Sequence, residues 1–251
     1  MLKRISSENA MRYSRQILLS GFDLEKQEIL LNSRVLQIGV GGLGCAAAQY
    51  LVSAGVGELT LVDDDEVETS NLQRQVLHTE SSIGLNKGVS AKRTLTALNS
   101  DASINLIQQR LSDDDLSEQV NQHDIVIDCS DNIETRNQLN RMCIKQQKPL
   151  VSGAAIRMEG QLSSFLPSAN NPCYECLSTM FTEQSLTCVE AGVMSPVVGI
   201  VGAMQALECV KILTHFGKPL TNKLMMFDGK SMEWQTYIIP KNNSCSACSM
   251  L

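Results

Sequence analysis

Residues 34–65 read RVLQIGVGGLGCAAAQYLVSAGVGELTLVDDD, and this stretch decides the fold. A short apolar run leads into a glycine-rich turn with the spacing Gly39-x-Gly41-x-x-Gly44, and an apolar helical stretch follows. A second short β-type run then ends in three acids. This order is typical of a βαβ unit whose turn approaches the phosphates of a nucleotide. A tight strand-to-helix turn without a ligand is the alternative.

The same alternation of short apolar runs and helical patterns continues to Gly153. The expected strands span residues 34–38, 59–62, 104–107, 124–129, 149–152, 161–166, 223–227 and 233–239. The expected helices span residues 7–16, 24–31, 42–54, 87–98, 132–146 and 194–214. Strands that alternate with helices predict an α/β fold with a Rossmann-like, doubly wound, mostly parallel sheet. The strands after Gly153 predict a C-terminal elaboration that is more antiparallel.

Length and charge limit the architecture and the partners. The 251 residues contain no repeat and no convincing linker, which predicts a single domain over residues 1–251. A net charge of −6, from 21 basic and 27 acidic residues, disfavours nucleic acid as the partner. There is no secretory signal, and Glu208 and Lys211 interrupt the most apolar stretch, residues 193–213. We therefore expect a cytoplasmic protein without a membrane partner, with this stretch packed in a core or at a subunit interface.

Polar residues around the glycine turn indicate which nucleotide binds. Asp63 lies 24 residues after Gly39, where a carboxylate can accept hydrogen bonds from ribose hydroxyls. Asp65 is either a further ligand or part of a solvated loop. Four other polar side chains are scattered around this half of the chain: Arg15, Asn71, Arg74 and Lys87. Each can also be an ordinary surface residue, but together they favour the triphosphate of ATP over the dinucleotide NAD.

An acidic residue follows the fourth expected strand. Asp131 and Asn132 come just after residues 124–129, at the carboxyl edge where open α/β sheets bind ligands. Asp131 can hold Mg²⁺, which takes one or two carboxylates together with phosphate oxygens. The equally weighted alternative is that Asp131 caps the helix that begins at Asn132.

The nine cysteines include two CxxC pairs, Cys173 with Cys176 and Cys245 with Cys248. Four thiolates suit tetrahedral Zn²⁺ in a closed, structural site. Because 68 residues separate the pairs, tertiary folding must assemble the site. A redox role is the alternative, but two such pairs outside a thioredoxin-like start make it less favoured. Cys188 stands alone and is either a nucleophile or an inert loop cysteine.

Several motifs occur together over most of the chain. They are residues 12–17, the glycine turn 39–44, the acids 63–65, the segment 70–75, Gly84-x-x-Lys87, Asp131-Asn132 and both CxxC pairs. As a set they resemble the ubiquitin-activating superfamily, from about residue 8 to Cys248. Within it, residues 151–161 and 186–194 are similar to bacterial adenylyltransferases that serve molybdopterin synthase. Adenylyltransferases of the thiamine pathway are the nearest alternative.

The resemblance implies an enzyme of molybdenum cofactor biosynthesis that works as a homodimer with ATP and Mg²⁺. Its protein substrate would be the small ubiquitin-like sulfur-carrier subunit of molybdopterin synthase, which ends in Gly-Gly. The terminal carboxylate would be adenylated with release of pyrophosphate, and a separate sulfur donor protein would act next. Residues 1–153 would be the nucleotide-binding half, and residues 154–251 the carrier-binding, zinc-stapled half.

The resemblance also implies roles for individual residues. Asp63 would bind the ribose, Asp131 would hold Mg²⁺, and Arg74 would reach across the dimer. The implied catalytic residues are Arg15, Arg74, Lys87 and Asp131. The implied ATP-binding residues are Gly42, Asp63, Asp65, Ser70, Asn71, Arg74, Lys87, Asp131 and Asn132. The implied zinc ligands are Cys173, Cys176, Cys245 and Cys248. Cys188 matches the cysteine of thioester-forming relatives, but it is not expected to be essential because the adenylate is the product.

Three other functions compete with this one. The glycine turn and Asp63 alone also fit an NAD-dependent oxidoreductase. A module that docks a sulfur carrier without chemistry would share the carrier surface. The same adenylation on the thiamine-pathway carrier would differ only in its partner.

Overall fold

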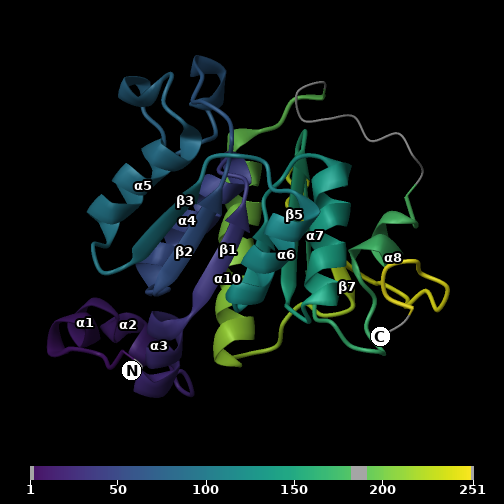
Figure 1. Ribbon diagram of the computed structural model, residues 1–251, viewed down its shortest axis with the longest axis horizontal. Coiled ribbons are helices and arrows are strands. Elements are labelled where there is room, and N and C mark those ends of the chain that lie inside the picture. The colour runs from purple at the N-terminus through teal and green to yellow at the C-terminus, as the bar shows by residue number, and fades with distance from the viewer. Residues whose placement is uncertain (1–2, 182–190, 250–251) are drawn as a thin grey trace.

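The computed structural model describes residues 3–181 and 191–249, and in this part of the chain eight strands form one mixed sheet (Figure 1). The strand order is β3-β2-β1-β4-β5-β6-β7-β8. The strands are β1 Arg34–Ile38, β2 Glu58–Val62, β3 Ser103–Ile107, β4 Ile125–Asp128, β5 Leu150–Ile156, β6 Glu159–Phe165, β7 Lys223–Asp228 and β8 Glu233–Ile238. The pairs among β1–β5 are parallel, and those from β5 to β8 are antiparallel.

Helices cover both faces of the parallel part of the sheet. They are α1 Ser7–Arg12, α2 Ser14–Ile17, α3 Asp23–Asn32, α4 Gly42–Ala54, α5 Lys87–Leu98, α6 Asp113–Gln122, α7 Ile133–Lys145, α8 Tyr174–Ser178 and α10 Ser195–Thr214, with 3₁₀ turns η1 Thr69–Asn71 and η2 Glu80–Ser82. Residues of α4, α5 and α10 build the core on one face. Residues of α6, α7 and α8 build the core on the other. The sheet is therefore the middle layer of three.

Each central strand supplies both cores, because successive side chains of a strand point to opposite faces. On β1, Val35 belongs to the α4 side and Leu36 to the α6 side. On β4, Ile125 and Ile127 face the α4 side and Val126 the other. Burial on both faces explains why these strands are almost wholly apolar and parallel.

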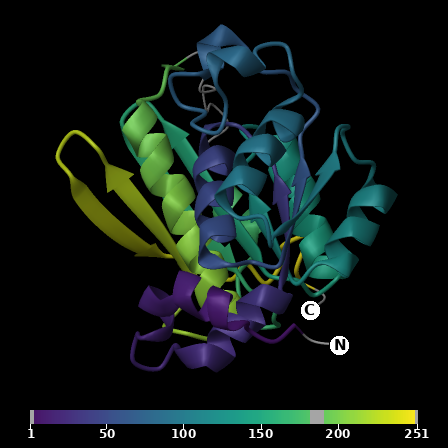
Figure 2. The same cartoon turned by 90° about the vertical axis from the view of Figure 1, so that its left-hand side faces the viewer.

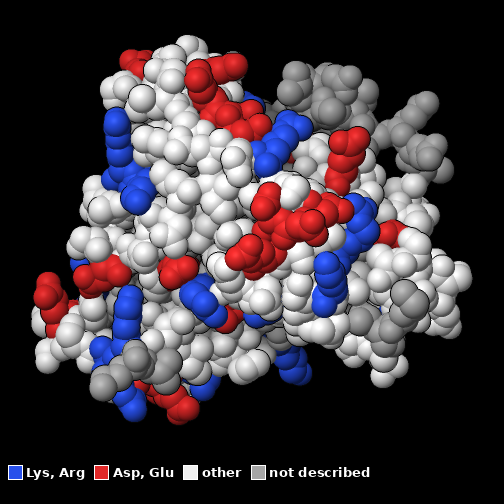
Figure 3. All heavy atoms as spheres, in the orientation of Figure 1, with Lys and Arg blue, Asp and Glu red and all other residues white. Residues whose placement is uncertain are grey.

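The other end of the sheet is exposed. Every residue of β8 is exposed, and the β7–β8 hairpin extends away from α10 in Figure 2. Trp234 of β8 stacks on Phe227 of β7, with ring centroids 4.4 Å apart. On the face seen in Figure 3, acidic side chains gather over α6 beside basic side chains over α7, so the charges on this face are mixed.

Helix α10 is long and apolar enough to span a membrane by length and composition alone. It packs on α4, β5 and β6, and Val197, Val201 and Cys209 are buried. Of the two expected placements, in a core or at a subunit interface, the structure shows packing in a core.

The expected α/β fold with a mostly parallel sheet is confirmed, and each expected strand is present with small shifts of its ends. The helix expected over residues 7–16 is two short helices that meet at Tyr13. Helix α6 was not predicted, because Leu116 and Val120 are its only buried apolar side chains and its pattern is weak.

Candidate active site

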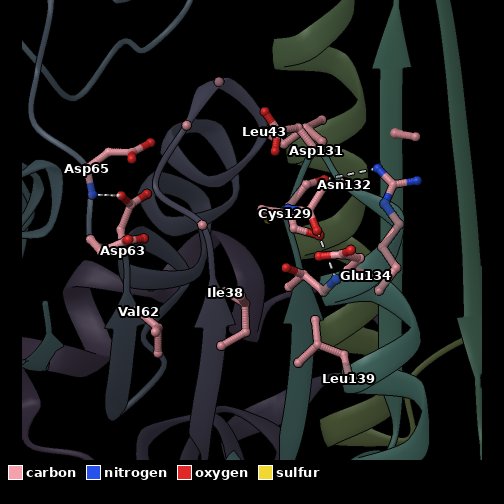
Figure 4. A pocket seen from close by; sticks show the side chains of 18 of the residues that line it. Ile38, Leu43, Val62, Asp63, Asp65, Cys129, Asp131, Asn132, Glu134 and Leu139 are labelled. Carbon is pink, nitrogen blue, oxygen red and sulfur yellow. Dashed lines mark hydrogen bonds between the residues drawn. The ribbon is translucent and has the colours of Figure 1, made fainter. Parts of the chain in front are cut away.

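A cavity of about 830 Å³ opens at the carboxyl ends of β1, β2 and β4. The glycine turn and the acidic turn after β2 form one wall, and the loop after β4 forms the other (Figure 4). Figure 4 shows Asp63 and Asp65 on one side facing Asp131 and Asn132 on the other. The cavity therefore lies where open α/β folds bind their ligands.

Two glycines of the turn are required by close backbone approaches. Gly39 has φ +93°, and a Cβ there would lie 2.7 Å from the carbonyl oxygen of Cys129. A Cβ on Gly44 would lie 2.1 Å from the carbonyl oxygen of Gly39. The turn thus passes so close to β4 and to itself that only glycine fits. Helix α4 then begins at Gly42 without a side-chain cap, and Gly42 and Leu43 of its first turn line the cavity.

Asp63 links the glycine turn to the acidic turn. Its Oδ2 accepts a hydrogen bond from the Val40 N–H at 2.6 Å, and its Oδ1 accepts one from the Asp65 N–H at 2.9 Å. Burial raises the pKa of the Asp63 carboxyl, against the lowering effect of both hydrogen bonds and the Lys87 charge. Asp63 lines the cavity. It is therefore both a scaffold for the glycine turn and an available acceptor.

Lys87, the first residue of α5, brings a buried positive charge to the cavity. Its Nζ donates to Asp65 Oδ2 at 2.7 Å, and its backbone N–H donates to the Asp65 carbonyl oxygen at 2.9 Å. The side chain is only 9% exposed. The sequence prediction that Lys87 and Asp65 lie at one site is consistent with this geometry.

The segment after β2 brings two more predicted residues to the cavity. Asn71 and Arg74 line it, and Arg74 Cγ lies 3.3 Å from where a Gly42 Cβ would stand. Arg74 Nη1 donates to the Ser70 carbonyl oxygen at 3.0 Å. Ser70 itself is not among the described residues that line the cavity, and its hydroxyl donates to Glu68. Ser70 thus contributes its carbonyl to the placement of Arg74.

Arg15 lies on α2, near the amino ends of the central strands, at the end of the sheet away from the cavity. The next residue, Gln16, donates to the carbonyl oxygen of Ala54 at the end of α4. The start of α4 at Gly42 is about 18 Å away, at 1.5 Å per residue. Figure 1 likewise places α2 beside α3, near the start of β1. Arg15 is exposed, and it is not among the described residues that line the cavity of its own chain.

The loop after β4 resolves the two alternatives for Asp131 in part. Asn132 is the N-cap of α7, and its Oδ1 accepts from the Thr135 N–H at 2.9 Å. Asp131 is exposed, lines the cavity and is not the cap. Its carboxylate suits a Mg²⁺ ion bound together with phosphate oxygens, because that ion prefers oxygen ligands.

Sequence reasoning missed an apolar part of the cavity. It is lined by side chains from β1, β2, α6, α7 and the loop before α6: Ile38, Val62, Leu111, Leu116 and Leu139. Figure 4 shows Ile38, Val62 and Leu139 below the two acidic walls. An apolar slot beside polar walls suits a flat heterocycle joined to a charged group. In the sequence these residues look like ordinary core positions, so no signal distinguished them.

A buried polar network under the β4 loop was missed as well. Asp128, fully buried, accepts from the hydroxyls of Ser130 at 2.6 Å and Ser152 at 2.8 Å. Arg136 lies 3.9 Å from Asp128, donates to the Ser130 carbonyl oxygen at 3.0 Å and lines the cavity. This network holds the loop that carries Asp131. The unusual acid at the end of an apolar strand was its only sequence signal.

The four cysteines of the CxxC pairs lie together and buried, on the α7 side of the sheet. The Sγ–Sγ distances are 3.9 Å for Cys173–Cys176, 3.7 Å for Cys173–Cys245 and 3.6 Å for Cys176–Cys248. A tetrahedral zinc with Zn–S bonds of 2.3 Å requires about 3.8 Å between sulfurs. The cluster is too open for disulfides and fits one such ion.

Two donors approach this cysteine cluster from outside. Asn140 Nδ2 lies 3.5 Å from Cys173 Sγ, and Lys241 Nζ lies 3.2 Å from Cys248 Sγ. Such contacts offset the negative charge of four thiolates. Cys188 lies outside the described residues.

Comparison with known proteins gives this geometry a context. Residues 13–247 match the ThiF family. The chain belongs to the ThiF family. Three of its relatives are molybdopterin-synthase adenylyltransferases: that of Salmonella typhimurium is 47% identical over 98% of the chain and 99% of the relative, that of Escherichia coli 48% over the same shares, and that of Haemophilus influenzae 50% over 95% and 98%. The sulfur carrier protein ThiS adenylyltransferase of E. coli is 43% identical over 97% of both chains.

Solved structures show the same fold as this ThiF-family chain. E. coli MccB in complex with MccA-N7isoAsn superposes with a TM-score of 0.85 at 26% identity, over 97% of the chain and 75% of MccB. E. coli MccB with ATP superposes with a TM-score of 0.81 at 25% identity, over 98% and 76%. The mixed sheet and its surrounding helices are therefore shared with these structures.

Proposed function

We propose that the chain adenylates the C-terminal glycine carboxylate of the small ubiquitin-like sulfur-carrier subunit of molybdopterin synthase, in molybdenum cofactor biosynthesis. The observation that carries the proposal is one cavity that combines the glycine turn, Asp63, the buried Lys87 and Asp131. The relatives named molybdopterin-synthase adenylyltransferase support the same reaction, at 47–50% identity over nearly the whole chain.

Each part of ATP suits a different part of the cavity. The apolar slot between Ile38 and Leu139 suits the adenine, and Asp63 suits the ribose hydroxyls. The first turn of α4, together with Lys87 and Arg74, suits the phosphates. The related MccB has been solved with ATP, which supports this assignment. A dinucleotide pyrophosphate is usually held by backbone N–H groups, whereas this cavity also presents the side chains of Lys87 and Arg74, so ATP is favoured over NAD.

The reaction needs charge neutralisation more than it needs a base. An oxygen of the carrier carboxylate attacks the α-phosphorus of ATP, a P–O bond forms, and the bond to pyrophosphate breaks. The products are an acyl-adenylate and pyrophosphate. Lys87 and Arg74 offset the charge that gathers on the phosphates, and the glycine turn aligns the α-phosphate. A carboxylate is already deprotonated near neutral pH, so no histidine is required.

Two metals belong to the proposal in different ways. Mg²⁺ bound with ATP would supply further neutralisation of phosphate charge, with Asp131 as its protein ligand. Zn²⁺ would be structural, because all four of its positions would be filled by Cys173, Cys176, Cys245 and Cys248. The sulfur spacing supports zinc, and the exposed carboxylate at the cavity supports Mg²⁺.

Several parts of the proposal concern partners. The carrier's Gly-Gly tail would enter beside residues 154–156 of β5, which line the same cavity. A sulfur donor protein would then convert the acyl-adenylate to a thiocarboxylate: a C–S bond would form, and the bond to AMP would break with release of AMP. The chain would act as a cytoplasmic homodimer. Because Arg15 is far from the cavity of its own chain, its predicted contact with phosphates requires a second copy.

Pyrophosphate exchange tests the proposal. Full-length protein should exchange labelled pyrophosphate into ATP only when a carrier that ends in Gly-Gly is present. The molybdopterin-synthase carrier should support exchange better than the thiamine-pathway carrier, because the thiamine-type relative is less similar, at 43% identity. A faster reaction with the thiamine carrier would favour that alternative. Carrier binding without exchange would leave only a docking module, and tight NADH binding without ATP binding would favour an oxidoreductase.

A further inference from the structure

His78 is buried beneath the glycine turn and touches two elements of the site. Its Nε2 lies 3.2 Å from the carbonyl oxygen of Val40, and its Nδ1 lies 2.9 Å from Ser90 Oγ on α5. The residue is only 6% exposed. It lies three residues beyond Gln75, and none of the roles proposed above uses it.

The hydrogen bonds fix the tautomer of His78. The Val40 carbonyl oxygen can only accept, so Nε2 carries the proton and donates it. Burial lowers the pKa of His78, and the nearby Lys87 charge lowers it further, although the bond to Val40 opposes this. The ring is therefore neutral near pH 7, and Nδ1 accepts the hydroxyl hydrogen of Ser90.

The carbonyl of Val40 shares a peptide plane with the N–H of Gly41. In a trans peptide the two bonds point in opposite directions, so holding the carbonyl toward His78 turns the Gly41 N–H away from it. Gly41 lines the cavity. Among residues 3–181 and 191–249, no hydrogen bond uses the Gly41 N–H. Because Gly41 lines the cavity and its N–H points away from His78, this donor is available to a ligand there.

The neighbouring peptide is held from the other side. The N–H of Val40 donates to Asp63 Oδ2 at 2.6 Å. Asp63 and His78 thus fix two successive peptide planes of the turn, one through an N–H and one through a carbonyl. Cys45 Sγ also approaches the Val40 carbonyl oxygen, at 3.4 Å, but a thiol is a weak donor.

We propose that His78 is a positioning residue that holds the 40–41 peptide and thereby directs the Gly41 N–H to a phosphate of ATP. This inference rests on the proposed ATP site. A hydrogen bond to the carbonyl also polarises the peptide, which strengthens the N–H as a donor. His78 therefore acts on phosphate binding through the backbone and does not touch the substrate.

Two substitutions separate the two ring nitrogens. In His78→Gln the side-chain amide nitrogen can occupy the place of Nε2 and donate to Val40. In His78→Asn the shorter amide reaches only the place of Nδ1, so the bond to Val40 is lost. The dissociation constants of ATP and of adenosine, measured by calorimetry on the full chain, give the readout. Adenosine lacks the phosphates and reports on the rest of the site.

We expect His78→Asn to weaken ATP binding about tenfold and His78→Gln less than threefold, the scale of one neutral hydrogen bond. Adenosine binding should change less than twofold in both. Ser90→Ala removes only the hydrogen bond between Ser90 and His78 Nδ1 and should weaken ATP binding about threefold. This variant tests the inference if the histidine variants do not fold. His123→Asn is the matched control and should leave ATP binding unchanged. His123 is also a buried histidine, but it is not among the described residues that line the cavity.

Equal losses in His78→Gln and His78→Asn would overturn the inference, since only one of them removes the bond to Val40. A parallel loss of adenosine and ATP would also overturn it, because the effect would then be general. If the wild-type protein binds no ATP, the proposed function fails first. The two failures are therefore distinguishable.

Discussion

Lys87 Nζ lies 2.7 Å from Asp65 Oδ2, and the lysine side chain is 9% exposed whereas that of Asp65 is 63% exposed. The cation is thus held in a buried position by a partner that faces water. An exposed carboxylate is well solvated, so its hold on the lysine is modest. A phosphate that enters the cavity can share or replace Asp65 as the partner without moving Lys87.

Replacing Lys87 with Ala should lower the rate of carrier-dependent pyrophosphate exchange by about 10²–10³, the scale of losing one electrostatic stabiliser. Lys92 lies on the same helix and is exposed, so Lys92→Ala is the control and should stay within twofold. A loss below threefold for Lys87→Ala would remove this lysine from the mechanism.

Asp131 and Asn132 are adjacent, but substituting Asp131 should affect the reaction rate, whereas substituting Asn132 should affect stability. Asp131→Ala should lower exchange by about 10²–10³ and leave the free energy of unfolding within about 0.5 kcal/mol. Asn132→Ala removes the cap of α7 and should cost about 1 kcal/mol of stability. Urea unfolding and exchange rates, measured on both variants, give the comparison. Similar stability losses would show that Asp131 has a structural role.

Metal analysis should find about one zinc per chain, because one closed site of four cysteines is present in the described residues. Cys173→Ser should lose the zinc and lower the melting temperature, since structural zinc contributes folding free energy. Cys143→Ala removes a buried thiol outside the cluster and should keep the metal. Metal-free protein with unchanged stability would contradict the assignment.

Acid should destabilise the protein through its buried histidines. Burial lowers the pKa of His123, so between that lowered value and about 6.5 the unfolded chain binds more protons than the folded chain. The free energy of unfolding therefore rises with pH through this window. The contribution of His123 to stability is lost as the pH falls from about 6.5 through the lowered pKa. His123→Gln should flatten the difference between urea unfolding at pH 5.5 and pH 7.5. If the variant shows the same difference between the two pH values as the wild type, His123 has the same pKa in the folded and unfolded chains.

Mixing inactive variants should show which arginine crosses a dimer. Arg74 lines the cavity of its own chain, so Arg74→Ala mixed with Asp131→Ala should stay inactive. This expectation differs from the role across the dimer that the resemblance implies. Arg15 is remote from its own cavity, so Arg15→Ala mixed with Asp131→Ala should recover roughly a quarter of wild-type exchange, if subunits of a two-site dimer redistribute freely. Recovery in the first mixture would restore the role of Arg74 across the dimer.

The sequence predicted the sheet because strands buried on both faces are apolar and their turns are punctuated by glycine. It predicted the cysteine cluster because spacing alone pairs Cys173 with Cys176 and Cys245 with Cys248. Helix α6 escaped prediction because its buried face is only two apolar residues wide. The apolar slot escaped because a side chain such as Leu139 looks the same whether it packs a core or lines a cavity.

The position of Arg15 could not be predicted for another reason. Motif spacing orders residues along the chain but does not tell which copy of the chain carries them to a site. The position of His78 has no signal in the sequence, because a lone histidine has no recognisable partner there and its bond to Val40 spans 38 residues.

The cysteine cluster joins sulfur atoms whose residues are 72 positions apart. A Zn²⁺ ion bound by all four cysteines would close the intervening chain, including α10 and the β7–β8 hairpin, into a loop. Helix α10 packs against α4, so this loop is tied to the layer that begins at the glycine turn. During synthesis, such an ion would gain all four ligands only once the second CxxC pair has been made. Until then the first pair would fill two of its four positions, so a chain arrested between the two pairs would be left with an incomplete site.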